Sequence, residues 1–371
     1  MLNSRTGKPL IGVLGFYGRG NSGDEAILCG IYESFRDEFD VVVVVDEHGA
    51  YRGFDGWYPY NEIERVHVGN IHYFAKRMAG LIVGGGGLGI GYGGSQALVC
   101  KFGGTPVVLA GTDHVHITKN LPGYRSRAAA LYLSIFDRVF LRSAPSVAAA
   151  QADGREVNYG ADWALRLVAP RPKERSSTAL ITLREWPMDI VQPDYYVAEI
   201  RRLVDTVRQA GLQPVFLPLA PEDELFLEKL GIAGMLPSRS LWSDTSKMVA
   251  EVAASAMVVS VGRLHAMVFA IANNTPTVQV IPPLEPDLKV GRFGKMRYMA
   301  EEFAIPFVSC EEAARLIESG DVTVSDETKK RHEEAQRRLS QMVADIKNLF
   351  RERTREWEDY RARRIDDYPY P

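Results

Sequence analysis

The first half of the chain alternates short apolar runs with segments whose apolar side chains recur at helical spacing. Residues 10–16 form the first apolar run, and residues 24–35 then carry an apolar stripe of helical period. Residues 40–46 include five consecutive valines, a composition typical of a strand buried on both faces. Further strands are predicted at 80–83, 105–110 and 138–141, and a further helix at 128–136. This alternation predicts a parallel sheet covered by helices.

A polar stretch with two prolines, residues 169–175, ends this first half and is typical of a linker. The alternation then starts again. Strands are expected at 178–183, 213–217, 257–261 and 277–281, and helices at 195–210 and 264–272. We therefore expect an α/β protein with two Rossmann-like domains, residues 1–168 and 176–326, that face one another across a cleft. Ligands of such sheets bind beyond the carboxyl ends of the strands.

The last part of the chain, residues 327–364, is rich in both charge signs and repeats apolar side chains at helical spacing. This pattern predicts a C-terminal amphipathic helix that packs by one face. The dense mixture of charges favours a solvated outer face over a surface for nucleic acid or lipid.

Composition narrows the class of protein. The chain has 371 residues, of which 46% are hydrophobic and 25% charged, as in ordinary globular proteins large enough for two cores. A net charge of −3 argues against nucleic acid as a partner, and no apolar run approaches the roughly 20 residues of a membrane span. Cys29, Cys100 and Cys310 lie far apart and predict neither disulfides nor a zinc site. Because no secretory segment opens the chain, we expect a cytoplasmic protein.

A glycine-rich turn joins the first predicted strand to the first helix. Gly18, Gly20 and Gly23 match the spacing GxGxxG, and Asp46 follows at the end of the next predicted strand. This is the arrangement of a dinucleotide site, so an NAD-dependent enzyme is one hypothesis.

The carboxylates of Asp24 and Glu25 weaken that hypothesis. They occupy the start of the helix, where the positive dipole end would otherwise attract a pyrophosphate. In one interpretation Ser22 and Asp24 only cap the helix. In the other, Asp24 and Glu25 hold and deprotonate sugar hydroxyls.

Residues 84–94 hold eight glycines in eleven positions, directly after a predicted strand. Glycine exposes backbone N–H groups and permits a ligand or the other domain to come close. We place Gly85 and Gly86 in the cleft on this ground, and a merely flexible loop is the alternative.

The strongest candidate for chemistry is the turn Gly262-Arg263-Leu264-His265 between a strand and a helix. We expect Arg263 and His265 in the first helical turn, where free N–H groups and the helix dipole already favour an anion. The Arg263 guanidinium can grip a carboxylate or a phosphate with two hydrogen bonds. The His265 imidazole can give or take a proton near neutral pH.

Three other strand ends carry polar candidates. Arg184 ends the first strand of the second domain and is expected to point into the cleft, unless it pairs with Glu185. His114 and Arg142 follow strands of the first domain and are expected along the groove. His114 and His116 form a His-x-His pair, but without a third ligand we predict no metal site.

Taken together, these segments resemble the polysaccharide pyruvyl transferase family. The segments that carry the resemblance are Gly18–Leu28, Gly84–Leu88, Gly262–Ala266 and Asp287–Phe293. Their order and spacing agree from about residue 10 to 310. Two places depart from the family pattern, namely Asp113-His114, where Gly-Pro is frequent, and residues 92–95, which lack an acidic residue.

The resemblance implies a GT-B-like fold and the transfer of pyruvate from phosphoenolpyruvate to a sugar as a ketal. Arg263, with its neighbours Gly262 and Leu264, and Arg184 would bind the donor, and His265 would protonate it. Asp24 or Glu25 would act on the acceptor. The other residues expected on the acceptor side of the cleft are Gly20, Asn21, Gly23, Gly85, Gly86, His114 and Arg142.

The implied partners are phosphoenolpyruvate, as a co-substrate, and a glycan or lipid-linked sugar, as in exopolysaccharide or cell-wall synthesis; no cofactor or metal is needed. A lipid-linked acceptor would bring the protein to the inner face of the cell membrane as a peripheral protein, and a homo-oligomer is left open. The alternatives are a GT-B glycosyltransferase that uses a nucleotide sugar, an NAD-dependent enzyme, and a non-catalytic relative that binds glycans.

Overall fold

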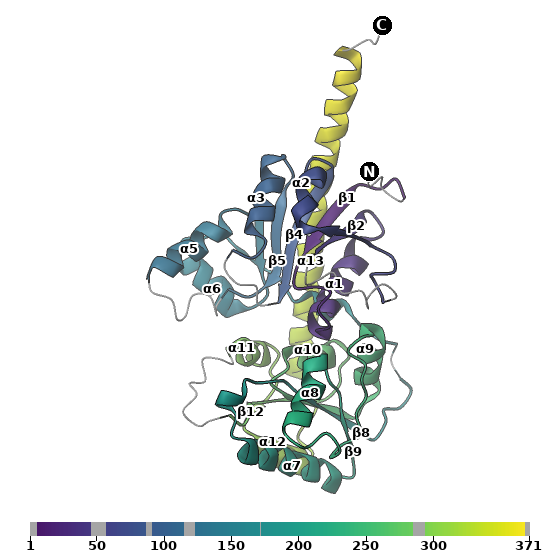
Figure 1. Ribbon diagram of the computed structural model, residues 1–371, viewed down its shortest axis with the longest axis vertical. Helices are drawn as coiled ribbons and strands as arrows, with labels where there is room; N and C mark the ends of the chain where they lie inside the picture. The colour runs from purple at the N-terminus through teal and green to yellow at the C-terminus, as the bar shows by residue number, and fades with distance from the viewer. Residues whose placement is uncertain are drawn as a thin grey trace.

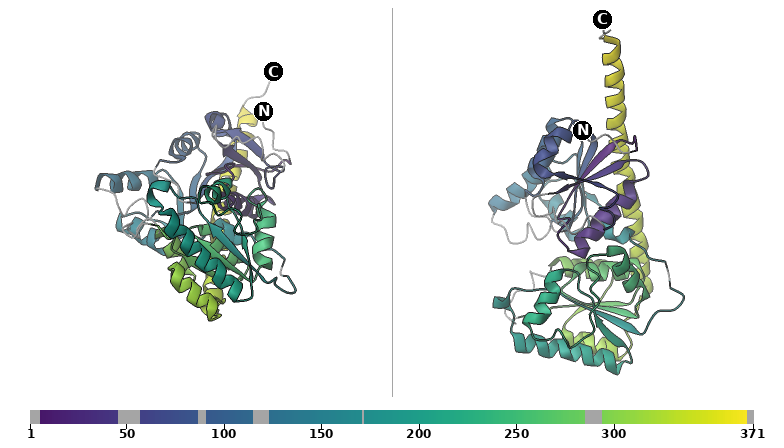
Figure 2. Two further views of the ribbon diagram at one scale, coloured as in Figure 1. Left: turned by 60° about the horizontal axis from the view of Figure 1, so that its bottom comes forward. Right: turned by 45° about the vertical axis from the view of Figure 1, so that its right-hand side comes forward.

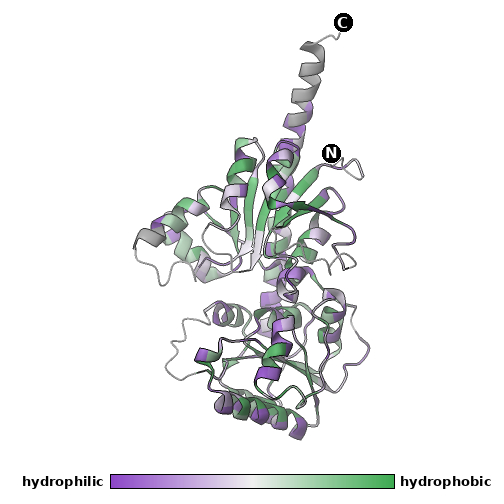
Figure 3. Ribbon diagram, in the orientation of Figure 1, coloured by the Kyte–Doolittle hydropathy of each residue, from purple (hydrophilic) through white to green (hydrophobic). Residues whose placement is uncertain are grey.

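The computed structural model describes residues 6–45, 57–86, 91–114, 123–170, 172–284 and 294–367. These residues form two parallel sheets with helices on their faces, placed one beyond the other along the long axis of the molecule (Figure 1). Hydrophobic strands form the interior of both layers (Figure 3). The predicted pair of Rossmann-like units is therefore confirmed.

The first sheet has the strand order β3-β2-β1-β4-β5-β6-β7, and all neighbouring strands are parallel. Its strands are β1 (Leu10–Leu14), β2 (Asp40–Val45), β3 (Glu64–His67), β4 (Met78–Gly86), β5 (Val107–Thr112), β6 (Arg138–Leu141) and β7 (Asn158–Tyr159). The valines of β2 are buried throughout, as its composition predicts. The strand order reverses between β1 and β4, so the carboxyl ends of these two strands open the crevice where such sheets bind ligands.

Helices cover both faces of this sheet. They are α1 (Ser22–Phe35), α2 (Ile71–Phe74), α3 (Gly94–Phe102), α5 (Gly123–Leu133) and α6 (Ala144–Ala152), with short 3-10 turns η1 (Val68–Asn70) and η2 (Trp163–Arg166). Helix α1 is buried almost all round because β4, η2 and the second half of the molecule surround it. Gly30 permits this packing, since a Cβ atom there would lie 2.2 Å from the Trp163 carbonyl oxygen.

The second sheet is smaller, with the order β12-β11-β10-β8-β9 and parallel pairing throughout. Its strands are β8 (Thr178–Leu183), β9 (Gln213–Phe216), β10 (Met257–Val261), β11 (Thr277–Val280) and β12 (Phe307–Val308). The order reverses between β8 and β10. The residues that follow these strands, Arg184 and Gly262, therefore lie at the second crevice.

The helices of this second layer are α7 (Pro193–Gln209), α8 (Pro221–Lys229), α9 (Thr245–Ala254), α10 (Leu264–Ala272), α11 (Gly294–Glu302) and α12 (Cys310–Glu318), with a 3-10 turn η3 (Met188–Ile190). Helix α10 is apolar on all sides and every residue of it is buried. It lies between the second sheet and the first layer, where it contacts α1 and η2. This central place explains why α10 lacks an amphipathic pattern.

The C-terminal helix α13 (Asp326–Asp367) joins the two layers. It runs from the second sheet along the first one, and its last turns extend beyond the globular part (Figures 1 and 2). Ala335, Leu339, Met342, Ile346 and Phe350 form its buried stripe. The predicted amphipathic helix is thus present, and it belongs to the cores of both layers.

Some boundaries differ from those expected. Strand β4 begins at Met78 and continues through Gly86, so the first glycines after Val83 belong to the sheet and not to a loop. Helix α5 ends at Leu133, three residues before the predicted end. Strands β3, β7 and β12 were not expected; β7 and β12 have only two residues each, and β3 carries a single fully buried position. Asp46, His116 and the segment 287–293 lie outside the described residues.

No helix among the described residues has both the length and the apolar character required to cross a bilayer.

The packing of Phe350 against the first sheet provides a test of how much α13 contributes to stability. Its ring lies against Gly80 of β4, where a Cβ atom would come within 2.0 Å of it, and packs on Phe35 and Phe39. Phe350→Ala should cost about 3–5 kcal/mol and lower the midpoint of thermal unfolding by roughly 10 °C. Glu352→Ala, an exposed change on the same helix, should shift it by about 2 °C or less. Equal midpoints for the two variants, measured by circular dichroism, would show that the stripe is not part of the core.

Candidate functional site

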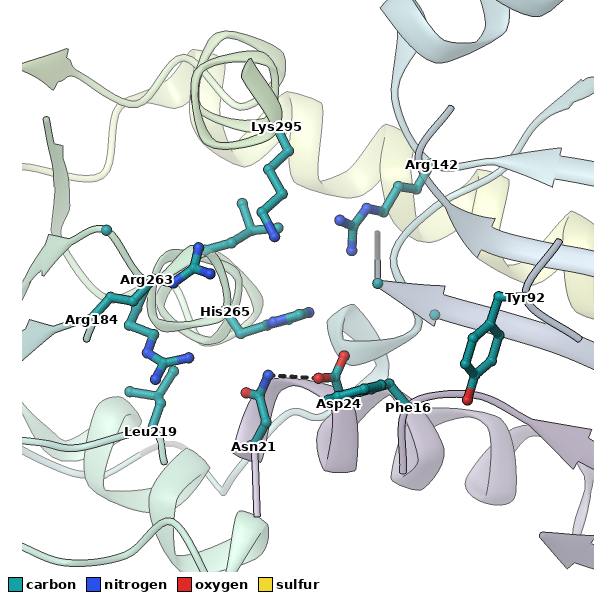
Figure 4. Close-up of a pocket in the computed structure, with 14 residues that line it drawn as sticks. Phe16, Asn21, Asp24, Tyr92, Arg142, Arg184, Leu219, Arg263, His265 and Lys295 are labelled. Atoms are coloured by element: carbon teal, nitrogen blue, oxygen red, sulfur yellow. Dashed lines mark hydrogen bonds between the residues drawn. The ribbon is translucent and has the colours of Figure 1, made fainter. Parts of the chain in front are cut away.

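A cavity of about 370 Å³ lies between the two sheets, at the carboxyl ends of β1, β4, β6, β8 and β10. Figure 4 shows its side chains arriving from both layers. The residues that line it are Phe16, Asn21, Asp24, Gly85, Gly86, Tyr92, Arg142, Arg184, Leu219, Gly262, Arg263, Leu264, His265 and Lys295. Ten of the fourteen residues predicted for the site from the sequence are among them. The first and second layers both contribute, so neither forms the cavity alone.

The turn after β10 brings Gly262, Arg263, Leu264 and His265 to the cavity. Gly262 has φ +83°, a conformation suited to glycine, and a Cβ atom there would lie 3.2 Å from Trp186. Arg263 is the N-cap residue of α10, so the prediction that it lies in the first helical turn is wrong, whereas His265 does lie there. The turn thus presents its backbone and three side chains to one space.

The Arg263 guanidinium already has a carboxylate partner. Its Nε donates to Asp223 Oδ2 at 2.9 Å, and its Nη2 donates to Asp223 Oδ1. Asp223 is fully buried and also accepts hydrogen bonds from the backbone N–H groups of Glu185 and Leu219. Arg263 is therefore held rigidly, with only Nη1 free of Asp223.

The imidazole of His265 crosses from the second layer to the first. Its Nε2 lies 3.6 Å from Asp162 Oδ2 and has no hydrogen-bond partner within the described residues. Its Nδ1 lies against Gly23 of α1, where a Cβ atom would come within 2.1 Å. Gly23 therefore has a steric role: it is the residue that lets α1 and α10 approach.

A buried ion cluster supports the cavity from the first layer. Arg142 lines the cavity and donates to Asp113 Oδ2 at 2.8 Å through Nε and to Asp162 Oδ2 at 2.6 Å through Nη1. Burial alone would raise the pKa of Asp162, but the Arg142 guanidinium and His265 hold that pKa well below its usual range. The same two carboxylates raise the pKa of Arg142 against the opposing effect of burial. Asp162 is thus a fixed negative charge beside His265.

Asp24 faces the cavity from the first turn of α1. Its Oδ2 accepts a hydrogen bond of 2.6 Å from Asn21 Nδ2, and Gly86 leaves room for its Oδ1. Burial raises the pKa of this carboxyl, although His265 and Lys295 act in the opposite direction. A carboxyl with a raised pKa suits proton transfer near neutral pH.

Glu25 does not line the cavity, and the prediction that it acts on the acceptor is corrected. Its Oε1 accepts hydrogen bonds from the N–H groups of Gly18 and Arg19, at 2.9 and 3.2 Å, and its Oε2 accepts from the Tyr60 hydroxyl. Its side chain is 3% exposed. Burial raises the pKa of Glu25 to about 7. Glu25 therefore holds the glycine-rich turn in shape.

The capping interpretation for Ser22 is also wrong. Asn21 caps α1, because its side chain accepts a hydrogen bond from the Gly23 N–H. Ser22 instead donates through both its N–H and its hydroxyl to the Leu219 carbonyl oxygen, each at 2.8 Å. These two bonds tie the start of α1 to the second layer.

The remaining glycines of the two loops have distinct positions. Gly85 and Gly86 have φ angles of +87° and +73° and line the cavity, as predicted. Gly20 has φ +79° and lies beside Pro221 and Trp242 of the second layer, next to the cavity and not on its wall. Both loops therefore bend through left-handed backbone conformations that favour glycine.

His114 does not line the cavity either, and its predicted acceptor role is corrected. It is 2% exposed, its Nε2 faces Asp153 at 4.0 Å, and its N–H donates to Ser146 Oγ at 2.8 Å. Its neighbour Asp113 reaches the cavity indirectly, through Arg142. No group of three or more His, Cys, Asp or Glu side chains among the described residues is arranged to hold a metal ion.

Arg184 and Lys295 bring two further cations to the cavity. The Arg184 guanidinium lies over the Trp186 ring, 4.8 Å from its centroid, while Glu185 pairs with Lys229 at 2.9 Å. Burial and then the neighbouring Arg263 lower the pKa of Arg184. Burial likewise lowers the pKa of Lys295 to about 8. Lys295 was not predicted, because no motif surrounds it; its place two residues after the segment 287–293 is the one signal that could have found it.

Solved structures with the same arrangement define the class as the GT-B fold. They include HepE from Anabaena in complex with UDP and glucose (14% identity, 92% of this chain and 99% of that chain, TM-score 0.54). Others are MnaA from S. aureus with UDP (12%, 87% and 91%, 0.56) and MurG from Acinetobacter baumannii (11%, 91% and 99%, 0.52). At these identities the likeness is one of fold. No curated protein matches the chain by sequence.

A family model specifies the group further. The polysaccharide pyruvyl transferase model matches residues 21–283, most of the chain from the start of α1 to the loop after β11. The chain belongs to this family.

The buried Glu25 predicts a pH-dependent stability. Because its folded pKa of about 7 lies above the usual value near 4.3, its contribution is full below about pH 4 and is lost as pH rises through 7. Wild-type stability should therefore fall between about pH 4.5 and 7 and level off above pH 7, measured as the urea midpoint of the first unfolding transition. Glu25→Gln keeps an oxygen to accept from the Gly18 N–H and should flatten this slope. An unchanged slope in Glu25→Gln would assign the pH dependence to another group.

Proposed function

We propose that this protein transfers pyruvate from phosphoenolpyruvate to a sugar and forms a cyclic ketal, in the cytoplasm and on a glycan or lipid-linked acceptor. Membership of the family supports the reaction. The observation that carries the proposal is the convergence of four cationic side chains, the His265 imidazole and the Asp24 carboxyl in one cavity of about 370 Å³. No further cofactor is required by the scheme.

The donor fits the cationic part of the cavity. Phosphoenolpyruvate carries a carboxylate and a phosphate, which guanidinium and ammonium groups and a helix N-terminus bind well. The second layer provides the cationic groups and the helix N-terminus through Arg184, the turn at Arg263 and the start of α10. We place the donor there, with its methylene carbon toward His265.

Proton transfer then follows from the positions of His265 and Asp24. The imidazolium of His265 gives a proton to the methylene carbon, which becomes a methyl group, and C2 becomes an oxocarbenium-like centre. One sugar hydroxyl attacks C2 and loses its proton to Asp24. The second hydroxyl attacks as the C2–O bond to phosphate breaks. The two hydroxyl protons balance the one that the methyl group gains and the one that leaves with phosphate.

The carboxylate of Asp162 prepares His265 for this role. The buried Asp162 carboxylate, 3.6 Å from Nε2, holds the imidazole ring in one orientation toward the first layer. Asp162 is a positioning residue, since it does not line the cavity.

A nucleotide-sugar glycosyltransferase is the second candidate, because HepE and MnaA were solved with UDP. Two features favour the smaller donor. Among the described residues that line the cavity, Asp24 of the first layer is the one carboxylate, so none of the second layer is placed to hold ribose hydroxyls. The second layer instead supplies Arg184, Arg263 and Lys295.

The proposal is tested by incubating the purified protein with phosphoenolpyruvate and a panel of glycan and lipid-linked acceptors. Release of inorganic phosphate that depends on acceptor, with a mass increase of the acceptor by one pyruvate less water, is the expected result. The same panel with UDP-sugars should release no UDP. Release of UDP without use of phosphoenolpyruvate would replace the proposal by the glycosyltransferase.

The adjacent carboxylates Asp24 and Glu25 provide a matched pair of variants. Asp24→Asn removes the base in the cavity and should lower kcat by about 10²–10⁴-fold. His265→Gln should have a similar effect, because the acid is lost. Glu25→Gln, one residue away and outside the cavity, should keep kcat within about threefold at pH 6.5, where its loss costs little stability. If Glu25→Gln were as inactive as Asp24→Asn, the separation of their roles would be wrong.

A further inference from the structure

The four cations of the cavity differ in how far their charge is already neutralised. Arg142 is bonded to two carboxylates, and Arg263 to one. Neither Arg184 nor Lys295 has an ion pair or a hydrogen bond to a carboxylate within the described parts of the chain. The described residues of the cavity therefore include two paired and two unpaired cations.

The unpaired cations are also withdrawn from water. Arg184 and Lys295 are each partly buried, one at the end of β8 and the other in the first turn of α11. Figure 4 shows Lys295 extended into the space that Arg142 and His265 also face. A desolvated cation without a partner raises the energy of the empty site, and a bound anion removes that cost. Paired guanidinium groups gain less from the same anion.

We propose that Lys295 and Arg184 are the cations that take up the two anionic groups of the donor, while Arg263 is fixed by Asp223 and orients the turn. The inference rests on the proposed function, because it concerns the same donor. It adds Lys295 as a ligand that no sequence pattern indicated, and it makes Arg263 mainly a positioning residue.

Lys295 gives this inference a distinctive pH signature. The charged groups that act on it are Arg184 and Arg142, which disfavour its proton, and Asp24 and Asp113, which favour it. With a pKa of about 8, Lys295 is cationic at pH 7 and mostly neutral at pH 9. An anion binds the cationic form, so its affinity should be nearly constant up to about pH 7.5 and fall by up to tenfold per pH unit above 8. Binding at pH 8 should also take up a fraction of a proton.

Calorimetric titration of the full-length protein with phosphoenolpyruvate, at pH 7 and 9, tests the inference. Lys295→Met should weaken binding at pH 7 by about tenfold or more, as expected for a lost charge-assisted hydrogen bond, and should abolish the fall between pH 7 and 9. Lys295→Arg keeps a cation that does not titrate in this range, so it should bind at both pH values. The control is Lys76→Met, an exposed lysine just before the amino end of β4, which should behave as wild type.

The outcomes separate the two proposals. If wild type binds phosphoenolpyruvate and Lys295→Met binds it equally well, the Lys295 inference is overturned and the proposed function stands. The inference is likewise overturned if Lys295→Arg, which is the variant least prone to misfold, reproduces the wild-type fall between pH 7 and 9. If wild type fails to bind phosphoenolpyruvate yet binds inorganic phosphate in a Lys295-dependent way, the proposed donor is wrong and Lys295 still acts as an anion ligand.

Discussion

The close approach of α1 to the second layer is the constraint on which the rest of the structure depends. Two hydrogen bonds from Ser22 to the Leu219 carbonyl oxygen hold the start of α1 in place. Gly23, with no side chain, then lets α1 lie directly on the His265 ring. Without this contact Asp24 and His265 would belong to separate surfaces, and the cavity between the layers would be open to water. A site built in this way loses its geometry whenever the two layers separate.

The close approach of the two layers also determines how the charged side chains of the cavity are paired. Buried charges are costly unless they are paired, and the structure pairs them in two different ways. Arg142 holds two carboxylates of the first layer, while Asp223 holds Arg263 within the second. These pairs fix side chains in position, whereas an unpaired cation keeps its charge available for a ligand. The paired residues thus give the cavity its rigidity, and the unpaired cations are left to bind a ligand. A catalytic site needs such fixed hydrogen-bond donors, because they must already be in place when negative charge develops on the substrate.

Local sequence patterns predicted the fold well because each strand is a compact apolar run. The bounds of β8, β10 and α10 agree residue for residue with those expected. The site was predicted where its residues follow a strand, as at Gly262 to His265. The direction in which a side chain points was not predictable where it depends on contacts distant in sequence. Asp24 and Glu25 are adjacent, but the helix turns about 100° between them. Asp24 therefore faces the cavity and Glu25 faces Tyr60. Lys295 and Asp162 enter the site only through packing, and His114 is directed away from it by Asp153 and Ser146.

The GT-B fold does not by itself select a ligand, because function belongs to the site and not to the fold. The crevice at the carboxyl ends of β8 and β10 is a general feature of open parallel sheets, and the start of α10 favours any anion. In this chain Arg184, Arg263 and Lys295 line the crevice from the second layer, and the Arg184 guanidinium lies over the Trp186 ring. The second layer therefore offers a small cationic space beside a histidine. A compact donor with two anionic groups, as proposed, would need no more than this space, and the residues proposed as its acid and base, His265 and Asp24, reach the cavity from opposite layers.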